Sequence, residues 1–147
     1  MLHSSVRIQE VLDFLGATHR VHQEIARRTQ SLLGLNLERA TLLLRVGEGG
    51  GEMTVSELAE RLFRTSQSVS ALVRAMEVEG LVTRRRDNMS DRRLVIVAWT
   101  SSGRAQVDGF QGLFTGIIGD VFANPLDANA VRRVRQAMVI IKEQLVI

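Results

Sequence analysis

The chain has 147 residues, of which 45% are apolar, and this length suits one globular domain with helical extensions. It contains no cysteine, which excludes disulfide scaffolds, cysteine-ligated zinc fingers, iron–sulfur clusters, thiol catalysis and cysteine-based redox sensing. The net charge is +3, and Arg supplies every basic side chain except Lys142. A high-GC genome and a functional basic surface both explain this preference for Arg.

The positive charge is concentrated in the middle of the chain. Between Arg61 and Arg104 there are nine Arg and four acidic residues, a net charge of +5, whereas the rest of the chain carries −2. A concentrated basic stretch is typical of a nucleic-acid-binding surface, and a solvated basic face is about as common. The local structure of this stretch decides between the two interpretations.

The sequence gives no sign of a membrane segment. The longest apolar runs, 94–99 and 137–141, are far shorter than a membrane-spanning helix requires. The first residues lack a basic region followed by an apolar stretch, so we predict no signal peptide and a cytoplasmic location.

The first third of the chain has the apolar periodicity of two helices. A stripe at helical spacing predicts a long helix over residues 5–33, which Gly34 ends. Asn36 is a candidate N-cap for a second helix that stops at Gly47. Residues 47–51 are glycine-rich but lack the Gly-Lys-Ser/Thr of a phosphate-binding loop, so we interpret them as a flexible connector.

Two short helices and a hairpin follow this connector. Thr54 fits a capping box and opens a helix over 55–62, and Thr65 opens a second helix over 66–79, which Gly80 ends. The period then changes to that of strands at 81–86 and 94–100, with a polar turn-forming cluster between them. This order predicts a winged helix-turn-helix.

The second helix of this unit has the composition expected of a helix that enters the DNA major groove. Its outward residues near the N-terminus are small and polar, and Gln can form paired hydrogen bonds with adenine. The three consecutive Arg at 84–86 alternate between the faces of a strand, so not all can face DNA, and an ion pair with an acid is the structural alternative for Arg84. The predicted DNA-contacting residues are Thr65, Ser66, Gln67, Ser68, Ser70, Arg74, Arg84, Arg86, Arg92 and Arg93.

Two helices with heptad-like seams close the chain. Val107, Phe110, Phe114, Ile117 and Val121 form the first seam, and a turn at Asn124-Pro125 precedes the second. Such seams suit pairing with other helices, including those of a second chain, although a core stripe explains either helix alone.

Several short motifs in this order resemble the MarR family of bacterial transcriptional regulators. They are Ser56-Glu57-Leu58-Ala59-Glu60-Arg61-Leu62, Ser68-Val69-Ser70, Glu79-Gly80-Leu81-Val82-x-Arg84, Asp91-Arg92-Arg93 and Thr100-x-x-Gly103, all within residues 54–103. The sequence departs from the family pattern at Phe63, in the turn between the helices, and at Trp99, which either packs under the wing or lines a pocket.

The resemblance implies a homodimer whose terminal helices interlock and whose two winged lobes bind a pseudo-palindromic double-stranded DNA operator. It also implies that Asp91 stabilises the wing and that Arg93 reaches the minor groove. We expect the dimer interface to include Val11, Leu15, Val131, Val134, Met138, Ile141 and Leu145.

The fold class expected is therefore mainly α with a small β-hairpin wing. We expect an N-terminal dimerisation helix over 1–35, a DNA-binding domain over 36–103 and C-terminal dimerisation helices over 104–147. The function expected is that of a repressor without a cofactor, released from DNA by a small aromatic or phenolic effector bound in apolar space between the dimer helices and the wings.

Three alternatives remain. An enzyme is disfavoured because no nucleophile, zinc-protease or nucleotide-binding motif is present. A metal-responsive regulator could use His19 and His22, which lie three residues apart on one helical face and lack a nearby carboxylate as third ligand. A winged helix can also bind protein, in which case binding would respond little to salt.

Overall fold

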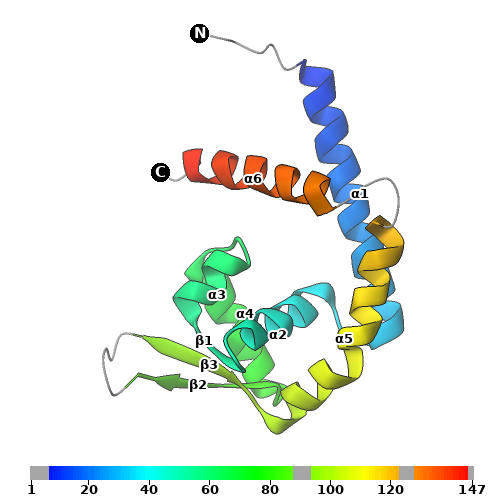
Figure 1. Ribbon diagram of the computed structural model, residues 1–147. Coiled ribbons are helices and arrows are strands. Elements are labelled where there is room, and N and C mark those ends of the chain that lie inside the picture. The colour runs from blue at the N-terminus through cyan, green and yellow to red at the C-terminus, as the bar shows by residue number, and fades with distance from the viewer. Residues whose placement is uncertain (1–6, 88–93, 123–127, 146–147) are drawn as a thin grey trace.

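A computed structural model describes residues 7–87, 94–122 and 128–145 of the chain. Figure 1 shows a winged lobe built from its middle part, with the long N-terminal helix extending away from it and the C-terminal helix lying across above it. The predicted fold class, mainly helical with a small antiparallel sheet, is confirmed. Within the described ranges, no helix has both the length and the apolar content needed to cross a membrane.

The two N-terminal helices begin and end close to the predicted residues. Helix α1 spans Ile8–Leu33, and Gly34 ends it with a left-handed φ of 64° that few other residues adopt. Helix α2 spans Leu37–Glu48, one residue beyond the predicted stop, and the Asn36 side chain accepts a hydrogen bond of 2.9 Å from the Arg39 amide.

The helix-turn-helix consists of α3, Val55–Arg61, and α4, Ser66–Val78. The side chains of Thr54 and Thr65 each accept a hydrogen bond from the amide three residues on, which confirms both predicted N-caps. The turn between the helices contains Phe63 at a φ of 56°, the only positive φ outside glycine in the described residues. A left-handed Phe is uncommon, and this is the position at which the sequence departs from the family pattern.

The wing contains one strand more than the predicted hairpin. Strands β2, Val82–Arg86, and β3, Val95–Trp99, pair antiparallel as expected, and a third strand, β1, Glu52–Thr54, pairs with the other edge of β3. The sequence did not indicate β1, because three residues are too few to show the alternation by which a strand is recognised. Its pairing ties the start of α3 directly to the wing.

The core of the winged lobe lies between its helices and the sheet. Leu43 of α2, Leu58 of α3, Met76 of α4 and Val97 of β3 are among its fully buried side chains. Burial of these apolar surfaces fixes how the two helices of the helix-turn-helix lie against the wing.

Two long helices follow the wing. Helix α5, Ser101–Phe122, packs against α1 and buries Val107, Phe110 and Ile117 of its predicted seam. Helix α6, Ala128–Gln144, crosses above the lobe in Figure 1 and has no buried residue of its own. Its apolar seam is therefore exposed in a single chain.

Trp99 connects the wing to the glycine-rich segment. Its indole Nε1 donates a hydrogen bond of 3.0 Å to the Leu43 carbonyl, and its backbone N–H donates one of 2.9 Å to the carbonyl of Gly51. A Cβ on Gly47 would lie 2.8 Å from the indole ring. The predicted connector thus has a further role, because its lack of side chains makes room for the single Trp.

Candidate nucleic-acid interface

Helix α4 presents the polar face predicted for DNA contact. Its opposite face buries Val69, Leu72, Val73 and Met76 in the core, which fixes the rotation of the helix about its axis. Of the predicted contact residues on this helix, Ser70 is half-buried and the others are exposed, namely Ser66, Gln67, Ser68 and Arg74. The fold therefore brings these side chains together on one solvent-facing surface, together with the exposed cap Thr65.

Ion pairs hold the carboxyl end of α4 on two sides. Arg39 of α2 contacts Glu79 at 2.5 Å, just beyond the helix, and Arg84 of β2 contacts Glu77 at 3.0 Å. Hydrogen bonds from these Arg side chains lower the pKa of both Glu carboxyl groups, so both remain ionised at neutral pH. Helix α4 is thus tied to its neighbours away from its polar N-terminal half.

The structure confirms the alternative prediction that Arg84 forms an ion pair with an acidic side chain. Its neighbour Arg85 contacts Glu52 of β1 at 3.1 Å, so these two adjacent Arg side chains have partners on different elements. Arg86 is exposed at the end of β2. DNA contact by Arg84 or Arg86 stays a prediction.

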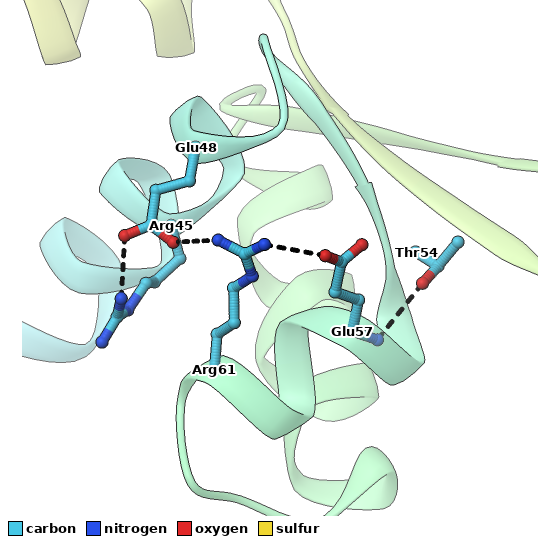
Figure 2. A network of polar contacts seen from close by, with 5 residues as sticks. All are labelled: Arg45, Glu48, Thr54, Glu57 and Arg61. Atoms are coloured by element: carbon cyan, nitrogen blue, oxygen red, sulfur yellow. Dashed lines mark hydrogen bonds and ion pairs between the residues drawn. The ribbon is translucent and has the colours of Figure 1, made fainter.

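A second ion-pair network joins α2 to α3, as Figure 2 shows. The Arg61 guanidinium lies between Glu48, at 2.7 Å, and Glu57, at 2.9 Å, while Arg45 contacts Glu48 from the other side. Burial raises the pKa of Glu48, but hydrogen bonds from Arg61 and Arg45 outweigh it, and the net pKa is lowered. Thr54, which caps α3 through the Glu57 amide, completes this cluster.

These ion pairs reduce the number of Arg side chains in the basic stretch that are available to DNA. Among the described residues, at least four Arg of this stretch contact carboxylates, and three of these use acids outside it: Arg61 with Glu48, Arg64 with Glu38, and Arg85 with Glu52. Within the described parts of the chain, no acidic side chain forms an ion pair with Arg74. Arg74 is therefore the basic side chain of α4 that remains available to an anionic partner.

The tip of the wing lies outside the described residues, and Asp91, Arg92 and Arg93 lie within it. Their roles in stabilising the wing and contacting DNA stay predictions. The described part of the wing ends with a hydrogen bond of 2.9 Å from the Asp87 amide to the Leu94 carbonyl, one position beyond the last pair of β2 and β3.

The residues predicted for a dimer interface are exposed in the single chain. They belong to α1 and α6 and are between 40% and 70% exposed: Val11, Leu15, Val131, Val134, Met138, Ile141 and Leu145. Exposed apolar stripes at this spacing on two helices are typical of surfaces that a partner covers.

Helix α6 also approaches the helix-turn-helix. The Lys142 ammonium lies 5.0 Å from the centre of the Phe63 ring. A groove of about 860 Å³ separates α6 from α3, and charged side chains such as Arg45, Glu60 and Arg135 form most of its lining. This groove does not match the apolar effector space predicted between the dimer helices and the wing.

A smaller pocket of about 290 Å³ lies beside Trp99. Leu44 and Gly47 of α2 line it together with Val107 and Gln111 of α5. Trp99 therefore both packs under the wing and lines a pocket, which were the two roles considered for it. His19 and His22 are exposed on α1, and the described residues contain no cluster of three metal-ligating side chains.

Together, the caps, the turn and the three-stranded sheet define a winged helix-turn-helix protein. The family model described as the MarR family matches residues 33–93, which include α2, the helix-turn-helix and the first strand of the hairpin. Over these residues, which form most of the winged lobe, the chain matches the MarR family.

Comparisons with individual proteins agree with this assignment. The chain is 32% identical to the HTH-type transcriptional regulator YcgE of Bacillus subtilis over 99 residues, which are 67% of this chain and span 62% of YcgE. The DNA complex of Sco3205, a MarR family transcriptional regulator from Streptomyces coelicolor, has a similar fold, with a TM-score of 0.79 and 20% identity over 95% of this chain and 89% of that chain.

A structure of the organohalide-sensing regulator RdhR with bound 2,4-dichlorophenol is also similar. Its TM-score is 0.71, with 20% identity over 99% of this chain and 89% of that chain. At this level of identity, both structures support the fold.

Proposed function

We propose that the protein is a homodimeric transcriptional regulator that binds double-stranded DNA through α4. The observation that carries the proposal is the exposed face of α4, where Gln67 and Arg74 stand on a helix fixed by its buried side and by ion pairs at its far end. The MarR family match and the DNA complex of Sco3205 support the same function. The dimer would bind a pseudo-palindromic operator and repress the adjacent gene.

The roles of the two side chains differ. Gln67 lies in the first turn of α4, where side chains reach base edges, and its amide can form paired hydrogen bonds with adenine. Arg74 lies two turns further along the helix and can contact a phosphate or a guanine.

Two substitutions test these roles on duplexes that the wild-type protein selects from a random pool. Gln67→Ala should relax the sequence preference at one base pair. Arg74→Ala should weaken binding and reduce the slope of log affinity against log salt concentration by about one, because one fewer cation contacts the DNA. Arg20→Ala, on α1 outside the lobe, is the matched control and should bind as the wild type does. If Gln67→Ala and Arg74→Ala both bind unchanged, the assignment of α4 is wrong.

The pocket beside Trp99 supports the proposal that a small aromatic molecule binds there as the effector. Its size suits a single ring, and it lies between α2, α5 and Trp99 at the end of β3, where an added group would alter how α5 lies against the lobe. RdhR was solved with 2,4-dichlorophenol, a molecule of this class.

The effector is tested with 2,4-dichlorophenol as the probe. Because Trp99 is the single Trp, binding in the pocket should change its fluorescence at the same phenol concentration that lowers DNA affinity. Release from DNA without a change in indole emission would place the effector elsewhere. No effect on either signal would exclude this phenol as an effector.

A further inference from the structure

Ala71 is an exposed apolar residue in the centre of the proposed DNA-contacting face. It follows Gln67 by four residues and precedes Arg74 by three, so the three side chains form one row along α4. The core face of the helix is filled by other residues, and Ala71 does not contribute to it. The sequence motifs did not single out this position.

The order of side-chain lengths in this row is informative. Two long side chains flank the shortest one that still carries a Cβ. When a helix lies in the major groove, which is about 12 Å wide, the middle of its contacting face comes closest to the base edges. A short side chain at this point allows the backbone to approach while Gln67 and Arg74 extend to either side.

We propose that Ala71 determines part of the sequence specificity by packing its methyl group against the C5-methyl group of a thymine. An apolar contact of this kind is one of the recurrent ways in which a protein distinguishes T·A from other base pairs. The thymine would lie next to the base pair that Gln67 contacts. This inference rests on the proposed function, since it requires α4 to lie in the major groove.

Single replacements of thymine by deoxyuridine in the selected duplex test the contact, because deoxyuridine lacks only the C5-methyl group. The wild type should bind one of these duplexes about fourfold more weakly, the factor that corresponds to exposing one methyl group. Ala71→Gly should bind that duplex and the thymine duplex equally well. Comparing two duplexes within one variant removes any effect of glycine on the stability of α4.

Val78→Ala is the matched control. Val78 is also apolar and 90% exposed on α4, but it lies at the last turn, away from the N-terminal half that enters the groove. This variant should keep the wild-type discrimination against deoxyuridine. Ala71→Leu should fold normally and bind every duplex roughly tenfold more weakly, because the larger side chain holds the helix away from the bases.

The outcomes separate this inference from the proposed function. If the wild type ignores every deoxyuridine replacement while Gln67→Ala still relaxes one position, Ala71 does not contact thymine and the DNA-binding function stands. The same conclusion follows if Ala71→Gly retains the full discrimination. If the protein selects no duplex at all, the proposed function fails, and the inference fails with it.

Discussion

Replacing Gly103 by alanine should destabilise the protein by about 1–3 kcal/mol, the range typical of an overpacked buried site. Gly103 is buried in the first turn of α5, and a Cβ there would lie 2.0 Å from the carbonyl oxygen of Leu81. Thr100 holds this contact in place, because its hydroxyl donates to the Gly80 carbonyl at 2.5 Å and accepts from the Gly103 amide at 3.0 Å. The backbone of Leu81 or of Gly103 therefore has to move before an added methyl group fits.

The free energy of unfolding, measured with denaturant and Trp99 fluorescence, gives the result directly. Gly109→Ala on the same helix is the control, since nothing lies within 4 Å of its added Cβ. It should be neutral or stabilising by up to about 1 kcal/mol, because alanine is the better helix former. Equal stability of the two variants would contradict the close packing of α5 against Leu81, the residue before β2.

Replacing Met138 by glutamate should separate the proposed dimer into monomers. Met138 occupies the middle of the exposed seam of α6, and in a symmetric dimer each subunit would bury one unpaired carboxylate. Such a buried charge costs about 3 kcal/mol per subunit. The variant should sediment as a monomer and lose most of its affinity for the selected DNA, because one lobe alone keeps only half of the contacts.

Gln136→Glu is the matched control for this substitution. It adds the same charge to the same helix on the side opposite the seam, and it should leave the dimer intact. The winged lobe of Met138→Glu should melt with an ordinary transition, since α6 contributes no buried residue to it. A dimeric Met138→Glu protein would show that the seam of α6 is not the interface.

The sequence predicted most of the fold because its local signals are strong. Asn36, Thr54 and Thr65 each cap the helix that they were expected to cap, and Gly34 ends α1 in the left-handed conformation. Periodicity also predicted which face of α4 is buried, and with it the polar face proposed to contact DNA. These features depend on neighbouring residues, which a sequence shows directly.

Features that depend on distant residues were not predicted. Strand β1 is recognisable only through its pairing with β3, some 44 residues further along at Met53 and Val97. The network around Arg61 joins acids from two helices, so counting charges along the chain overstated the number of Arg side chains available to DNA. The Thr100-x-x-Gly103 motif was noted without its cause, which is the contact of Gly103 with Leu81.

The selection of bound duplexes by the wild-type protein, followed by titration of affinity against salt, tests the central claim most directly. A dimer that binds through α4 should enrich an inverted repeat whose half-sites are centred about 10 base pairs apart. Its affinity should fall steeply as salt rises, since Arg side chains displace counterions from the phosphates. A pool without enrichment, together with an affinity that salt does not change, would contradict DNA binding and favour a protein partner.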